Sequence, residues 1–414
     1  MLDLADKLWR GEVPIEDAHP FAPRHELVEV APRTAFIASF GNVCAFETGE
    51  GLVLVDTGSQ FAAPTICEAL RNWSAAPVHG IVYSHGHVDH VMGAALYDSE
   101  AVALSRPKPQ VFAHEAVVAR FQRYRLTAGY NSIINRRQFQ LTELIWPTDF
   151  RMPDRTYHDA LSFMVGGERF ELHHARGETD DATWVWVPDR GIVACGDLFI
   201  WTLPNCGNPQ KVQRYALDWI HALHEMAATR PDVLLPGHGL PIIGRDRINQ
   251  TLLESAELLQ SLHDQTVDLM NSGASLDQVI HSVKPPAVLM ARPYLKALYD
   301  EPEFIVRNIW RLNGGWWDGD PSQLKPAPVA AVAAEVARLA GGAGKLAARA
   351  RELAEAGDLR LASNLVELAA RAAPDDEVVM ETRAAIYAAR AELETSTMSR
   401  GIFNWAAGES KPAK

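Results

Sequence analysis

The sequence HGHVDH at residues 85–90 constrains this chain more than any other feature. Three imidazoles and one carboxylate lie in this run, directly after the apolar residues 81–83. Neutral imidazoles and carboxylates are the usual ligands of zinc and other divalent metals, and packing alone gives no reason to gather them at a strand end. The run therefore predicts a metal site at the carboxyl end of a buried strand.

Length, charge and cysteine usage narrow the class of protein. With 414 residues, the chain is too long for one ordinary core, which predicts two domains. The net charge of −13 argues against nucleic-acid binding, and no apolar run reaches the roughly 18 residues of a membrane helix. The four cysteines lack paired spacing and the first 14 residues lack a signal-like apolar run. Together these features favour a cytoplasmic protein with reduced thiols.

The first half of the chain alternates between strand and helix patterns. Apolar runs and turn signals predict strands at residues 27–39, 43–47, 51–55, 78–83, 111–113, 169–174, 183–187, 192–194 and 233–235, and helices at 64–73 and 115–124. Such alternation is typical of α/β layer folds, in which loops at strand ends carry the chemistry.

The pattern changes near residue 247, after which strand signals almost disappear. We therefore predict a catalytic domain at residues 1–247 and a helical domain at residues 248–414. Within the second domain, Leu361, Leu365 and Leu368 are spaced for one apolar face of a helix.

Further groups with metal-binding chemistry follow later strands. Glu178, Asp197 and His238 each come shortly after a predicted strand, as the ligands of a two-metal centre would. Asp56 follows the strand at 51–55 and is expected to orient a ligand histidine rather than to bind metal. Nearby groups that remain alternatives to Glu178 are His173, His174, Asp180 and Asp181.

The run at residues 85–90 resembles the HxHxDH signature of the metallo-β-lactamase superfamily. The resemblance implies an α/β fold, the αββα sandwich, holding two metal ions that we expect to be zinc, although other divalent metals remain open. The ligands that it implies are His85, His87 and Glu178 for the first metal, Asp89, His90 and His238 for the second, and Asp197 as a bridge between the two.

Glu178 stands where the superfamily usually has histidine, which resembles the alkyl sulfatase branch. Glu178 and Asp197 lie 19 residues apart (197 − 178), a separation typical of the two acidic ligands in that branch. The branch has glutamate at the second position, where this chain has Asp197.

The second half resembles the same branch. The sequence GGWWDGDP at residues 314–321 looks like part of the alkyl sulfatase dimerisation domain. The resemblance implies an all-α dimerisation domain after the sandwich, and a homodimer. Trp310, Trp316 and Trp317 are expected in the interface core or, alternatively, along an apolar substrate path.

We therefore expect a hydrolase of small molecules, with neither nucleic acid nor membrane as a partner. A hydroxide held between the metals would attack an alkyl sulfate ester, with Asp89 and Asp197 as catalytic carboxylates. The alternatives in the superfamily are lactone, thioester, β-lactam and phosphodiester hydrolysis; an iron oxidoreductase and a non-catalytic binding protein are alternatives from other classes. Candidate substrate-binding residues are Tyr130, Asn131, Arg136, Arg137, Lys211 and Arg214.

Overall fold

The computed structural model describes residues 1–410 and divides into two compact units. The first, here called the sheet unit, comprises residues 1–128, 147–274 and 278–315. The second, here called the helical unit, comprises residues 129–146 and 275–277 together with the chain from residue 316. The sheet unit thus continues past residue 247, where the sequence predicts a domain boundary.

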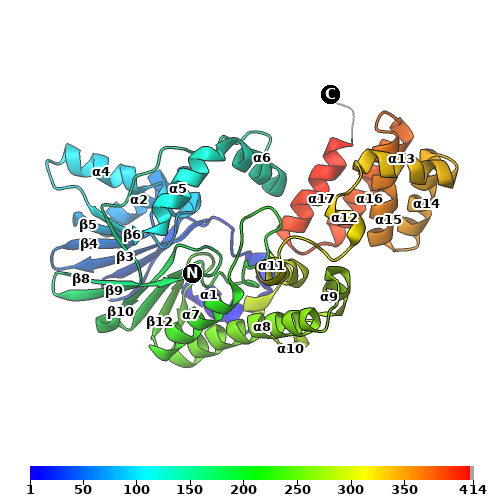
Figure 1. The fold of residues 1–414 in the computed structure, drawn as a ribbon. Helices are drawn as coiled ribbons and strands as arrows, with labels where there is room; N and C mark the ends of the chain where they lie inside the picture. Colours follow the sequence, from blue (N-terminus) through cyan, green and yellow to red (C-terminus); the bar gives the residue numbers. More distant parts are fainter. Residues whose placement is uncertain (411–414) are drawn as a thin grey trace. The chain divides into compact units, whose positions relative to one another are not determined.

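Two β-sheets form the centre of the sheet unit (Figure 1). One has seven strands in chain order: β1 (Glu26–Ala31), β2 (Thr34–Ala38), β3 (Val43–Thr48), β4 (Gly51–Val55), β5 (Val78–Val82), β6 (Gln110–His114) and β7 (Arg155–Tyr157). The other has the order β13-β12-β11-β10-β9-β8, formed by β8 (Ala160–Val165), β9 (Glu168–Ala175), β10 (Ala182–Val187), β11 (Ile192–Gly196), β12 (Val233–Pro236) and β13 (Ile242–Ile243).

The two sheets pack face to face around an apolar core. Every residue of β4 and of β11 is buried. The rings of Phe46 in β3 and Phe170 in β9 lie 5.6 Å apart, and those of Phe112 in β6 and Phe163 in β8 stack at 4.3 Å. These contacts join one sheet to the other, as expected for packed sheets.

Helices cover the outer faces of both sheets (Figure 1). In the sheet unit they include α1 (Leu2–Trp9), α2 (Ala63–Trp73), α3 (Val88–Val91), α4 (Ala94–Ala103), α5 (Ala116–Leu126), α7 (Ala216–Ala228), α8 (Arg245–Asn271), α10 (Ala287–Met290) and α11 (Pro302–Gly314). Helices α2, α4 and α5 lie over the first sheet, and α7 and α8 over the second. The predicted αββα sandwich is confirmed.

Parallel pairing determines where the functional loops gather. Strand β5 pairs in parallel with β4 and β6, and β11 pairs in parallel with β12. The carboxyl ends of parallel neighbours meet at one edge of a sheet. Loops that follow β4, β5, β11 and β12 therefore start at two such edges, and these loops carry Asp56, residues 84–90, Asp197 and His238.

The helical unit contains little besides helices. It holds most of α6 (Ala128–Phe139), together with α12 (Pro321–Leu324), α13 (Val329–Ala340), α14 (Ala343–Glu355), α15 (Leu359–Ala372), α16 (Glu377–Leu393) and α17 (Thr397–Glu409), while α9 (Leu276–Ser282) begins in it. Helix α15 buries Ala362, Val366 and Ala369, whereas Leu361 is 46% exposed. The predicted leucine face is therefore displaced from the one that the helix buries.

One further prediction of local structure was wrong. The expected strand at 27–39 is a hairpin of β1 and β2, because the chain turns at Arg33 with a positive φ of 58°. The segment with the candidate residues Tyr130 and Arg136 is helical in α6. Strands β7 and β8 were not predicted. Within residues 1–410, no helix combines the length and the apolar composition that a membrane span needs.

Candidate metal centre

Asp56 fixes the start of the histidine loop after β5. Its backbone adopts a positive φ of 65° directly after β4. One carboxylate oxygen accepts the Ser84 amide at 2.7 Å, and the other accepts the Ser84 hydroxyl at 2.6 Å and contacts His90 Nδ1 at 2.8 Å. Asp56 therefore orients a histidine, the role expected from the sequence.

Three histidines direct the same ring nitrogen towards one point. Nδ1 of His85 lies 3.0 Å from the Ser84 hydroxyl, and Nδ1 of His238 contacts the carbonyl oxygen of Phe40. With Nδ1 of His90 held by Asp56, Nε2 of each ring is left for the interior of the site. Among the described residues, buried Nε2 of His85 and of His90 finds no hydrogen-bond partner.

Asp197 lies at the centre of these imidazoles. Its carboxylate oxygens are 3.6 Å from His85 Nε2, 3.3 Å from His90 Nε2 and 3.3 Å from His238 Nε2. A Cβ at Gly237 would collide with Asp197 Oδ1, so only glycine permits this approach. Asp89 Oδ2 lies 3.6 Å from Nε2 of both His90 and His238.

Glu178 meets His87 on the other side of Asp197. Oε1 of Glu178 lies 3.9 Å from His87 Nδ1, accepts a hydrogen bond from Asn205 Nδ2 at 2.5 Å and is 3.4 Å from Nη2 of Arg214. The carboxylate is buried beside Asp197, which is also buried. Two acidic groups this close need compensating positive charge.

The structure brings all seven predicted ligands to one place. Their ligand atoms form three groups within 4.8 Å: His85, His90 and Asp197; Asp89, His90 and His238; and His87, Glu178 and Asp197. Asp197 and His90 each belong to two groups, and of these two side chains the carboxylate, with its two oxygens, is the one suited to a bridge. The division between the two metals differs from the expected one in that His85 groups with His90. The assignment of each residue to an ion stays a prediction.

Burial and charge set the protonation of the site. Burial lowers the pKa of His85 and of His87, so both imidazoles are neutral near neutral pH, as ligands must be. Burial raises the pKa of Glu178 well above its usual value, with Asp197 adding to the effect. Burial opposes protonation of His90, yet neighbouring carboxylates, Asp197 foremost, hold its pKa well above the ordinary value. A bound cation would relieve this concentration of acidic groups.

The alternatives to Glu178 lie in other interactions. Asp181 accepts the Arg120 guanidinium at 2.6 Å and the Gly86 amide at 3.1 Å, which supports the histidine loop from behind. His174 Nε2 lies 3.0 Å from the Asp180 carbonyl oxygen. His173 stacks on a tryptophan ring at 4.2 Å. Among the described residues, none of these four side chains belongs to the metal-binding groups.

The candidate substrate residues fall into two sets. Arg214 is buried beside Glu178, and Lys211 is half-buried in the same loop. Burial lowers the pKa of Lys211 to about 7, and Arg214 adds to this effect. The other set belongs to α6: Tyr130 is 60% exposed, Asn131 is buried, and Arg136 and Arg137 are half-buried. Residues 129–146 are part of the helical unit.

Two asparagines of the site were missed by sequence reasoning. Asn205 donates to Glu178, and Asn42 supports the His238 loop by donating to the carbonyl oxygens of Pro236 and Gly239 at 3.0 Å each. Neither follows a strand in a recognisable motif, so the sequence held no signal for either.

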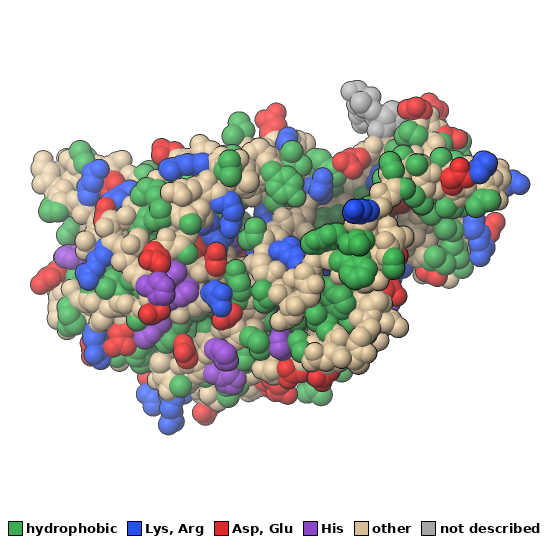
Figure 2. Space-filling view, viewed as in Figure 1, with side chains coloured by type: hydrophobic (Ala, Val, Ile, Leu, Met, Phe, Trp, Pro, Cys, Tyr) green, Lys and Arg blue, Asp and Glu red, His purple; other side chains and the backbone are tan. Residues whose placement is uncertain are grey.

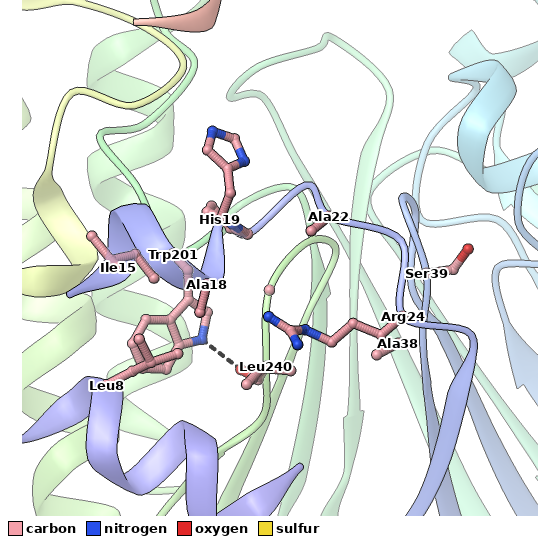
Figure 3. A pocket seen from close by; sticks show the side chains of 12 residues that line it. Leu8, Ile15, Ala18, His19, Ala22, Arg24, Ala38, Ser39, Trp201 and Leu240 are labelled. Atoms are coloured by element: carbon pink, nitrogen blue, oxygen red, sulfur yellow. Dashed lines mark hydrogen bonds between the residues drawn. The ribbon is translucent and has the colours of Figure 1, made fainter. Parts of the chain in front are cut away.

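A small pocket lies beside the His238 loop but is separate from the ligands (Figure 3). Leu8, Ile15 and Trp201 contribute apolar surface to it, and Trp201 Nε1 donates to the Leu240 carbonyl oxygen at 2.5 Å. Gly239 lines the pocket, whereas none of the seven predicted ligands does. The metal centre therefore lies outside this pocket.

Two family models match this chain, and curated relatives match most of its length. Residues 37–238 match the family model of the metallo-beta-lactamase superfamily, and residues 275–412 match that of alkyl sulfatase dimerisation. A linear primary-alkylsulfatase of Pseudomonas sp. is 27% identical over 380 residues, which cover 87% of this chain and 71% of that protein. An alkyl/aryl-sulfatase of Saccharomyces cerevisiae is 24% identical over 373 residues, covering 82% of this chain and 56% of that protein.

Solved structures share the fold. The stereoselective inverting sec-alkylsulfatase Pisa1 from Pseudomonas sp. superposes with a TM-score of 0.84 at 21% identity, covering 93% of this chain and 65% of that chain. The chain thus matches a metallo-β-lactamase superfamily domain and an alkyl sulfatase-type dimerisation domain. It is a metal-dependent hydrolase that resembles the alkyl sulfatases.

Proposed function

We propose that this chain is a binuclear zinc hydrolase of alkyl sulfate esters. The observation that carries the proposal is the pair Arg214 and Lys211, which belong to a loop that contacts the ligand Glu178. A guanidinium and an ammonium beside a metal centre favour an anionic ester over a neutral one. The names of the relatives, all alkyl or alkyl/aryl sulfatases, support the same substrate class.

The donor set fits two divalent ions. Imidazole nitrogens and carboxylate oxygens suit zinc, and buried Nε2 atoms of His85 and His90 have no hydrogen-bond partner among the described residues. Bound there, two ions would supply Lewis acidity and make water ionise near neutral pH. Copper, manganese and iron accept similar donors, so the choice of zinc is part of the proposal.

The residues of the site have distinct roles in this proposal. Asp197 lies among the three Nε2 atoms and holds the two metal sites together. Asp89, which is partly exposed, accepts a hydrogen bond from the attacking water and orients it. Arg214 and Lys211 would bind the sulfate group and stabilise the negative charge that it carries in the ester and gains in the product.

We also propose a homodimer. Residues 275–412 match a dimerisation family, and the helical unit exposes apolar side chains, such as Val329, Val332 and Leu339, among its charged groups (Figure 2). An obligate dimer would bury more than about 2,000 Å² in total. Light scattering at micromolar concentration should give twice the mass of the chain, and a stable monomer would contradict the dimer.

A cytoplasmic location stays part of the proposal, because all four cysteines are free thiols.

A panel of substrates tests the activity. Metal content is measured on the purified protein, and turnover is then measured with primary and secondary alkyl sulfates, a lactone, a thioester, nitrocefin and a phosphodiester. We expect two zinc ions per chain and turnover of an alkyl sulfate. If a lactone or thioester is hydrolysed and no alkyl sulfate is, the hydrolase class stands and the sulfatase proposal fails.

A further inference from the structure

The loop that carries Arg214 is held in place by α11. Between β11 and α7 the chain has no regular secondary structure over residues 197–215, so its shape depends on contacts from elsewhere. Helix α11 belongs to the same sheet unit as this loop, although the dimerisation family model also covers it. The middle of the loop and its carboxyl end are bonded to residues 300–308.

Asn308 binds the main chain of Arg214 in the manner of a strand partner. Its Oδ1 accepts the Arg214 amide at 3.2 Å, and its Nδ2 donates to the Arg214 carbonyl oxygen at 3.0 Å. Gln213 Nε2 donates to Asn308 Oδ1 at 2.9 Å and to the Arg214 carbonyl oxygen at 2.9 Å. Asn308 is buried, so water does not compete for these bonds.

Asp300 holds the middle of the loop. Its carboxylate accepts the Gly207 amide at 2.5 Å and the Glu301 amide at 2.7 Å. Gly207 lies so close to the backbone of Phe304 and Ile305 that a Cβ would collide with it. The loop is therefore packed directly on the first turn of α11.

The guanidinium of Arg214 is buried beside Glu178 and has one unused donor within residues 1–410. Nη1 donates to the Val212 carbonyl oxygen at 3.1 Å and Nη2 lies 3.4 Å from Glu178, while Nε is buried without a hydrogen-bond partner among the described residues. The direction of this guanidinium depends on the backbone that Asn308 fixes.

We infer that Asn308 is a positioning residue for the sulfate group of the substrate, acting through Arg214. The inference rests on the proposed function and adds a residue of α11 to it. Asn308 does not touch the substrate or the metal ligands. It contributes by keeping the Arg214 main chain in one conformation, so that little ordering remains when the anion binds.

The test compares two asparagines of the same helix. Asn308→Ala removes the bonds to Arg214, whereas Asn313→Ala, on the exposed side of α11, removes only a bond to the Ile309 carbonyl oxygen. Binding of inorganic sulfate to the metal-loaded protein is measured by calorimetry. We expect Asn308→Ala to weaken sulfate binding and to raise KM for an alkyl sulfate, each about tenfold, the loss of one or two buried hydrogen bonds. Metal content and kcat should stay within about twofold of the parent protein.

The outcomes separate the inference from the proposed function. If the parent protein neither binds sulfate nor hydrolyses any alkyl sulfate, both are overturned. If the parent does both and Asn308→Ala behaves as Asn313→Ala does, only the inference is overturned. Should Asn308→Ala fail to fold, Gln213→Ala decides, because it removes a second donor to the Arg214 carbonyl oxygen from a half-buried position; a rise in KM of about threefold supports the inference, and an unchanged KM overturns it.

Discussion

The two loops that build this site are held in different ways. The histidine loop at residues 84–90 follows β5 and is held by Asp56, which comes directly after the neighbouring strand β4. The loop at residues 197–215 is much longer and is held by Asn308, 94 residues beyond Arg214. The first loop carries metal-binding groups, and the second adds the candidate anion-binding groups.

This difference explains why the metal ligands could be predicted from the sequence, whereas the anchoring of the long loop could not. Metal ligands gather here because parallel strands end at one edge, and a strand end is visible as an apolar run followed by polar residues. The anion-binding groups depend on packing between a loop and a distant helix. Such packing has no periodicity, so no pattern in the sequence predicts it.

Removal of a ligand from the histidine loop should have the largest effect. In His85→Ala, the Nε2 atom 3.6 Å from Asp197 is lost, and we expect metal binding to fall with it and turnover of an alkyl sulfate to fall at least about 1,000-fold. Elemental analysis and initial rates measure both. His79→Ala, on the exposed face of β5, is the matched control and should change neither. Full activity and unchanged metal content in His85→Ala would contradict the assignment of His85 as a metal ligand.

Glu178 lies where the two loops meet, so its replacement tests how the metal site depends on the point of contact between them. Glu178→Gln keeps the shape of the side chain but removes the charge, and we expect metal affinity to fall about 10- to 100-fold while the fold survives. Competition with a chromogenic chelator measures the affinity, and circular dichroism checks the fold. If affinity and turnover survive, Glu178 is not a metal ligand, and the resemblance to the alkyl sulfatase branch loses its main support.

Much of the fold followed from the sequence, and the failures have physical causes. The sandwich and the gathering of seven site residues depend on strand periodicity and on polar groups at strand ends. The split of residues 27–39 was missed because Arg33 adopts a positive φ that is unusual for arginine. In α15 the buried positions include Ala362, Val366 and Ala369, while Leu365 and Leu368 pack at the border of this core, so the buried face is offset from the leucines.

Loss of the Lys211 ammonium from the long loop should weaken the binding of charged substrates and leave the binding of neutral substrates unchanged. In Lys211→Met the apolar stem is kept and the ammonium is lost, so KM for an alkyl sulfate should rise about tenfold while KM for a neutral ester stays the same. Steady-state kinetics on both substrates measure the ratio. Lys284→Met, after α9 and outside this loop, is the control. An equal rise for both substrates would mean that Lys211 supports the loop rather than the anion.

The smallest effect concerns the stability of the anchored loop and its dependence on pH. Burial raises the pKa of Asp300 to about 7. The amides of Glu301 and Gly207 and the charge of Arg214 oppose this shift. The other titratable groups that face Asp300 are Glu301 and Cys206. Between pH 4 and 7 the native state therefore keeps a proton that the unfolded state, with an ordinary pKa near 3.8, releases. The contribution of Asp300 to the free energy of unfolding is therefore fully present below about pH 4, and it is lost as the pH rises through about 7.

Asp300→Asn removes this titration and isolates its contribution. The midpoint of denaturant unfolding is measured from pH 5 to pH 8 for the parent protein and for the variant. The parent should lose stability over this range relative to the variant, by an amount on the order of 1 kcal/mol, about the value of one pKa unit. Asp264→Asn, an exposed position on α8, serves as the control and should run parallel to the parent. If Asp300→Asn also runs parallel to the parent, the carboxylate is ionised throughout. The long loop would then be held by a charged anchor, as the histidine loop is held by the carboxylate of Asp56.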